Sequence, residues 1–159
     1  LGVNVRDEYR LTPRLFVFGQ NQYLKDQFKN IDYLLAPTGG LGFKWFDTPA
    51  TKLGVDGSVG AVWEKNPGLA VGSSGAVAVG EKLVQTLTST TTVTQVFTGL
   101  WKTSDFEDAL FTLGASIAAS MSTRTQLKFE VLDTFKSKPP DITIQKNDVA
   151  VLMSLVYKM

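Results

Sequence analysis

The sequence predicts an all-β fold, specifically an antiparallel up-and-down transmembrane β-barrel. Three observations lead to this prediction. Apolar and polar residues alternate with a period of two along much of the 159-residue chain, as they do in extended strands. The alternating segments are longer than the five or six residues that are usual in globular sheets. No run of about 20 apolar residues is present, so a membrane could be crossed only by strands.

The clearest alternation lies between residues 31 and 64. From Ile31 to Trp45, and again from Leu53 to Trp63, the odd-numbered residues are mostly apolar and the even-numbered ones are mostly charged, polar or small. The turn-forming run Asp47-Thr48-Pro49-Ala50 separates the two segments, which are therefore expected to form a hairpin. An apolar face with aromatic ends, opposite a face of charge and glycine, is typical of strands between lipid and a barrel lumen.

The other strands are expected on both sides of this hairpin, separated by polar or proline-containing turns. In chain order they cover residues 3–11, 15–24, 74–87, 91–101, 109–121, 126–135 and 149–159. Together with the hairpin they give about nine strands in an antiparallel meander. The faces of 15–24 and 74–101 stay unassigned, because apolar residues occur at both parities or share a parity with charged ones.

Charged residues fall mostly on the even-numbered face, which is expected to line the lumen. A basic residue facing lipid near the bilayer centre would cost about 2–4 kcal/mol, so these charges should point inward. The lumen-facing candidates are Arg6, Glu8, Arg10, Asp32, Lys44, Lys52, Asp56, Glu64, Lys128, Glu130 and Lys158. Their mixed signs favour a lumen filled by salt bridges slightly over an open, selective pore. Asp7, Lys82 and Asp133 fit this pattern poorly.

Turn lengths indicate an orientation. The turns near residues 13, 49, 89 and 123 are short, those near 28, 68 and 140 are longer or more polar, and the one near 105 is intermediate. Bacterial outer-membrane barrels have short periplasmic turns and long external loops, so the short turns are expected at the periplasmic end. Two aromatic belts follow, with Tyr9, Trp45 and Tyr157 at the inner interface and Tyr33, Trp63 and Phe135 at the outer one.

Composition argues against other classes of function. The chain has 16 basic and 15 acidic residues and a net charge of +1, so nucleic acid is not an expected partner. It has no cysteine or histidine, which removes thiolate chemistry, cysteine-bound zinc and the usual base at neutral pH. The glycines of residues 39–42 lie within a strand, whereas a phosphate loop precedes a helix. Acid pairs such as Asp56 with Glu64 have no accompanying nucleophile, so neither an enzyme, nor a cofactor, nor a metal site is expected.

Two parts of the chain are similar to a known family. The first is Tyr23-Leu24-Lys25-Asp26-Gln27-Phe28-Lys29-Asn30-Ile31-Asp32 with Gly40-Leu41-Gly42-Phe43 after it, and the second is Pro139-Pro140, Asp148 and the ending Ser154-Leu155-Val156-Tyr157. On these residues the chain resembles the DUF481 family, also described as salt-induced outer-membrane proteins. The spacing is preserved over most of the chain and is least similar over 71–101. The resemblance implies an outer-membrane β-barrel of Gram-negative bacteria with no established activity.

The chain departs from this family in two ways. Its last residue is Met159, where members tend to end in an aromatic residue, and members carry further N-terminal strands with a Gly-Asn-Thr element. The resemblance implies about twelve strands in the full barrel, which agrees with the even strand number of bacterial barrels. Residues 1–159 are therefore expected to form a single barrel domain that lacks its first strands.

The leading functional prediction is a porin-like outer-membrane barrel, embedded in outer-membrane lipid and acting as a small pore or as a structural barrel. One alternative is a soluble lipocalin-like barrel around an apolar ligand, which requires the apolar face inside. A second alternative is a non-conducting barrel whose loops at 65–72 and 136–146 bind a protein partner.

Overall fold

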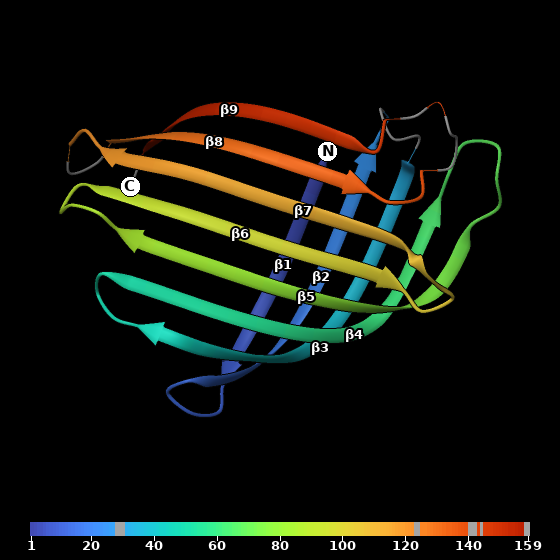
Figure 1. The fold of residues 1–159 in the computed structure, drawn as a ribbon, viewed down its shortest axis with the longest axis horizontal. Coiled ribbons are helices and arrows are strands. Elements are labelled where there is room, and N and C mark those ends of the chain that lie inside the picture. The colour runs from blue at the N-terminus through green and yellow to red at the C-terminus, as the bar shows by residue number, and fades with distance from the viewer. Residues whose placement is uncertain (28–30, 123–124, 140–142, 144, 158–159) are drawn as a thin grey trace.

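Nine β-strands in one sheet make up the fold. The computed structural model describes residues 1–27, 31–122, 125–139, 143 and 145–157, and these contain no helix. The strands are β1 (Gly2–Arg10), β2 (Leu15–Asp26), β3 (Ile31–Asp47), β4 (Thr51–Lys65), β5 (Gly72–Thr86), β6 (Thr91–Lys102), β7 (Asp105–Ser120), β8 (Thr125–Lys136) and β9 (Asn147–Tyr157). Each strand pairs antiparallel with the next in chain order, as the sequence predicts (Figure 1).

The sheet is strongly curled, and β1 to β3 cross behind the later strands in Figure 1. β1 and β9 are its two edges and are not paired with each other, so in this structure the sheet is open and the predicted closed barrel is not formed. Successive strands alternate in direction, so the first and ninth could meet only as parallel neighbours. A purely antiparallel closure of these nine strands is therefore not available.

Curling gives the sheet an inner and an outer face. Even-numbered residues occupy the inner face, where Phe16, Leu34, Val62, Leu100 and Leu110 are each at most 6% exposed. Odd-numbered residues occupy the outer face, where many large apolar side chains are 37–66% exposed. These include Leu41, Phe43, Val59, Val79, Leu113, Ile117 and Phe129. The apolar face of the well-patterned strands is thus the exposed one, as the alternation predicts.

The structure assigns the faces that the sequence leaves unassigned. Phe16 and Phe18 of β2 are buried on the inner face. In β5 the inner face carries Ala76 and, with the same parity, Lys82, so this lysine follows the general pattern after all. Glu81 takes the opposite parity, and its Oε2 accepts a hydrogen bond of 3.3 Å from Gln95 Nε2.

Two bulges disturb the alternation in β3. The register shifts between Leu24 and Asp26 opposite the start of β3. There Ile31 is 1% exposed and Asp32 is exposed, which is the reverse of the expected order. A second shift between Lys44 and Phe46 lies at the far end of the strand. An extra residue in one strand reverses the faces beyond it, which is why a strict period of two fails at both ends.

Close approach of β3 to its neighbours β2 and β4 depends on glycine. A Cβ built on Gly60 would lie 2.1 Å from the carbonyl oxygen of Pro37, and one on Gly42 would lie 2.1 Å from the ring of Phe16. Both contacts are far shorter than non-bonded heavy atoms allow. The glycine-rich part of the central hairpin is therefore needed for packing, in agreement with its placement inside a strand.

One predicted turn is wrong in extent. The turn of intermediate length expected near residue 105 is reduced to Thr103-Ser104, because β7 begins at Asp105. This connection is therefore tight, and it breaks the predicted alternation of short and long turns. The predicted turns near 28, 123 and 140 fall partly outside the described residues. Within the described part of the chain, no helix is long and apolar enough to cross a membrane.

Candidate functional site: a charged interior

Four charged side chains from four strands meet on the inner face, at the end of β4 farthest from the Thr48-Pro49-Ala50 turn. Lys102 Nζ lies 2.6 Å from Glu64 Oε2 and 2.5 Å from Asp108 Oδ2. Lys136 Nζ lies 3.0 Å from the same Glu64 oxygen and 3.0 Å from Asp108 Oδ1. Each amine therefore bridges both carboxylates, and we call these residues the four-charge cluster.

The four-charge cluster is buried beside the apolar core. The side chains of Glu64 and Lys136 are only 4% and 2% exposed. Val62 precedes Glu64 by two residues on the same face of its strand, and Leu100 stands in the same relation to Lys102. A single buried charge costs several kcal/mol, so this burial requires the strict balance of two cations and two anions. The cluster and core together occupy this end of the interior.

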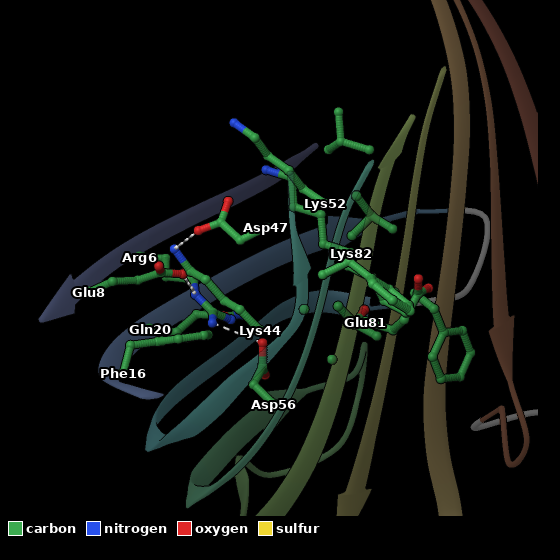
Figure 2. Close-up of a pocket in the computed structure, with 18 of the residues that line it drawn as sticks. Arg6, Glu8, Phe16, Gln20, Lys44, Asp47, Lys52, Asp56, Glu81 and Lys82 are labelled. Atoms are coloured by element: carbon green, nitrogen blue, oxygen red, sulfur yellow. Dashed lines mark hydrogen bonds and ion pairs between the residues drawn. The ribbon is translucent and has the colours of Figure 1, made fainter. Parts of the chain in front are cut away.

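Arg6 of β1 forms a second group of polar contacts. Its guanidinium donates hydrogen bonds to Glu8 Oε1 and Asp56 Oδ2, both at 2.8 Å, and to Gln20 Oε1 at 3.2 Å. The guanidinium carbon also lies 3.7 Å from the centre of the Phe18 ring, a cation–π geometry. Arg6 thereby ties β1 to β4, although these strands are not neighbours in the sheet (Figure 2).

A cavity of about 540 Å³ lies between Arg6 and the Thr48-Pro49-Ala50 turn (Figure 2). We call it the turn-end cavity. Its wall combines basic, acidic and apolar side chains from six strands, β1 to β6. They include Arg6, Lys44, Lys52, Lys82, Glu8, Asp47, Asp56, Phe16, Val84 and Val96. The inner face is thus filled at one end and hollow at the other.

The structure distributes the predicted lumen residues over several environments. Those with the side chain 4–33% exposed on the inner face are Arg6, Lys44, Asp56, Glu64, Lys128 and Glu130. Glu8 contacts Arg6 but is 43% exposed, and Arg10, Asp32 and Lys52 are exposed. Lys158 lies outside the described residues. Lys128 pairs with Glu130 at 2.8 Å along one strand, whereas Asp56 and Glu64 belong to separate groups and form no acid pair.

The predicted aromatic belts are mostly at the surface. Tyr9, Trp45 and Trp63 are 71%, 58% and 38% exposed. Tyr33 and Phe135 are half-buried, and the ring centre of Phe135 lies 6.2 Å from that of Phe111. The side chain of Tyr157 is not among those described.

Sequence reasoning missed three of the four residues of the four-charge cluster. Lys102, Asp108 and Lys136 stand one residue beyond the strand ends expected from the sequence, so none of them was assigned to a strand face. Extending the alternation by one position would have placed all three on the even-numbered face.

No group of three or more His, Cys, Asp or Glu suited to a metal ion is present among the described residues. Lys138 follows β8 and forms ion pairs with Asp105 and Glu107. These ion pairs raise the pKa of its amine above the ordinary value.

Comparison with known proteins gives one match. The family model described as "Protein of unknown function, DUF481" matches residues 2–159. The match spans nearly the whole chain and agrees with the resemblance seen in the 23–43 region and at the C-terminal end. No curated protein and no solved structure matches the chain.

Proposed function

Because the chain belongs to the DUF481 family and exposes an apolar outer face, we propose that it is a β-barrel protein of the bacterial outer membrane. The observation that carries the proposal is that apolar side chains are exposed on the outer face and charged side chains are buried on the inner face, the reverse of a soluble domain. Leu41, Val59 and Ile117 are 45–66% exposed, while Glu64 and Lys136 are nearly fully buried. Soluble domains rarely expose contiguous apolar surface on this scale, but lipid requires it.

The proposed role is a structural barrel with a filled interior. The four-charge cluster blocks one end of the inner face with ion pairs, and the apolar core packs beside it. An open pore would need a continuous wet path with charge available to the solute. Closure of the sheet is part of this proposal, because lipid offers no hydrogen-bond partner to the unpaired edges.

The burial pattern gives no support to a soluble lipocalin-like barrel. Such a barrel keeps its apolar side chains around the ligand and its charges in water. Here Phe43 and Phe129 are exposed on the outer face, while Lys44 and Lys128 lie on the inner one with 20% and 33% of the side chain exposed.

Spin labelling tests the proposal, since the chain contains no cysteine that would interfere. Ile117→Cys places a label on the outer face, and the matched control Ser116→Cys places it on the inner face of the same strand. In neutral-lipid vesicles, the label at 117 should be accessible to oxygen dissolved in the bilayer and protected from a water-soluble nickel complex. The label at 116 should show the lower oxygen accessibility of the two.

Two results would overturn the proposal. One is equal exposure of both labels to the nickel complex, with protein that stays monodisperse in buffer without detergent. The other concerns the filled interior alone: stable, reproducible conductance steps in planar bilayers would show an open path and reject the structural barrel in favour of a pore.

A further inference from the structure

Gly54 of β4 leaves a gap in the wall of the turn-end cavity, and lysines from β3 and β5 lie on either side of it. Gly54 is opposite Lys44 on one side and opposite Lys82 on the other. Neighbouring strands are about 4.8 Å apart, so the two lysine backbones are separated by about 10 Å across the gap. A Cβ on Gly54 would meet only the carbonyl oxygen of Phe43, at 3.9 Å. The gap is therefore free space between two amines.

The positive charge around Gly54 is less compensated than that of Arg6. Arg6 is matched by Glu8 and Asp56, each at 2.8 Å. In contrast, Lys44 has only a 3.9 Å contact with Asp47. Lys52 and Lys82 form no ion pair with any residue that the structure describes, and they are diagonal neighbours because Lys52 is opposite Val84. Two acids remain in the cavity wall beside these amines, Asp47 and Glu81, and Glu81 already accepts a hydrogen bond from Gln95. Three amines facing two acids leave an excess of positive charge, which favours an anion at this position.

Apolar side chains line the same cavity beside the lysines. Phe16 of β2, Val84 of β5 and Val96 of β6 all have the inner-face parity and line the cavity. Figure 2 shows Phe16 on the same side of the cavity as Arg6. The volume of about 540 Å³ falls in the range of pockets that hold small molecules, about 300–1,000 Å³. An inorganic anion would leave the apolar part of this wall unused.

We propose that the turn-end cavity binds a small organic anion, a carboxylate or a phosphate ester with a short alkyl portion. The charged head lies over Gly54 between Lys44 and Lys82, with Lys52 near it, and the alkyl portion lies against Phe16, Val84 and Val96. The binding site itself does not depend on the membrane. Only the side of access rests on the proposed function, which puts the short turns, and hence this cavity, at the periplasmic end.

Titration calorimetry with three matched probes tests binding. The full chain in neutral-lipid nanodiscs is titrated with octanoate, octyl phosphate and octyl glucoside, and empty nanodiscs provide the background of partitioning into lipid. Saturable binding of one or both anions, with no saturable binding of the glucoside, is the expected result, and the two anion arms separate carboxylate from phosphate recognition. Equal behaviour of all three probes would overturn the proposal.

Paired variants locate the site. Gly54→Leu fills the gap on the inner face, whereas Gly57→Leu adds the same side chain to the same strand on the outer face, where nothing lies within 4 Å. Gly54→Leu should weaken binding about tenfold or more, and Gly57→Leu should leave the Kd unchanged. Equal losses in both variants would contradict the proposed site.

A second pair of variants removes charge and tests the site even if Gly54→Leu does not fold. Lys82→Gln should weaken anion binding about tenfold, while Lys25→Gln, on another strand and away from the cavity, should not. Unchanged affinity in Lys82→Gln would reject the assignment. If the protein is monodisperse in buffer without detergent, the membrane proposal fails, and the same titrations are then carried out in buffer. Saturable anion binding there would still support this site, so the two proposals fail on different results.

Discussion

Glu64 and Lys136 are separated by 72 positions in the chain, yet Oε2 of the first lies 3.0 Å from Nζ of the second. Their strands, β4 and β8, are four places apart in the sheet, and the two side chains meet only because the sheet curls over its inner face. Both side chains are almost completely buried. The contact therefore reports the curvature of the whole sheet rather than any local pairing.

Removing Lys136 should destabilise the fold strongly. Lys136→Met leaves the buried Glu64 and Asp108 with Lys102 as their only cation within the four-charge cluster, and breaking a buried ion pair from one side costs about 3–5 kcal/mol. The measurement is urea unfolding in lipid or detergent, followed by tryptophan fluorescence. The matched control is Lys138→Met, which breaks ion pairs at the exposed surface and should shift the midpoint little.

A double variant separates loss of the pair from loss of the side chain. Glu64→Gln combined with Lys136→Met removes one charge of each sign and keeps the Lys102–Asp108 pair at 2.5 Å. It should be less destabilised than Lys136→Met alone, because no unmatched buried charge remains. A double variant as unstable as the sum of the two single ones would mean that these charges do not act together.

A methyl group at position 60 should disturb the central hairpin. The Cβ of Gly60→Ala would lie 2.1 Å from the carbonyl oxygen of Pro37, which belongs to the backbone and cannot rotate away. Overpacking of this kind costs about 1–3 kcal/mol. Gly57→Ala is the control in the same strand, since its Cβ meets nothing within 4 Å. Equal unfolding midpoints for the two variants would show that β3 and β4 do not approach this closely.

Asp133 should be a destabilising residue in the folded protein. Its Oδ1 is buried without a hydrogen-bond partner among the described residues, in an outer-face groove lined by Phe97, Phe111 and Phe135. An unsatisfied buried polar group costs about 1–3 kcal/mol, so Asp133→Leu should raise the unfolding free energy by a similar amount. Asp148→Leu removes the same charge from an exposed position on the neighbouring strand and should not stabilise the protein.

The sequence predicted the faces correctly wherever a strand alternates without interruption. Val59 and Ile117 are on the exposed face because a period of two fixes the direction of each side chain once the strand is extended. The same rule failed at Ile31 and Asp32, where a bulge reverses the faces. Bulges have no consistent signature in side-chain hydrophobicity, so a pattern of apolar residues cannot locate them.

The interior was predictable as charged but not in its contacts. Glu64 was expected to face inward, but its partners Lys102 and Lys136 stand at strand ends, where turn residues obscure the alternation. Their meeting also depends on how far the sheet curls, which the residues of any single strand do not determine. The turn-end cavity has the same origin, because Arg6 and Val96 are brought to it by curvature.

A charge at position 59 distinguishes lipid from water at the outer face. Val59 lies near the middle of β4 and is 66% exposed, so in water Val59→Lys should cost almost nothing. In a bilayer the same lysine should cost about 2–4 kcal/mol, while a lysine near the interface should cost at most about 1 kcal/mol. Ala50→Lys, in the adjacent short turn, is the interface control. Unfolding in lipid vesicles should therefore show a large loss for the first variant and little for the second, and equal midpoints for both would mean that β4 does not cross the bilayer.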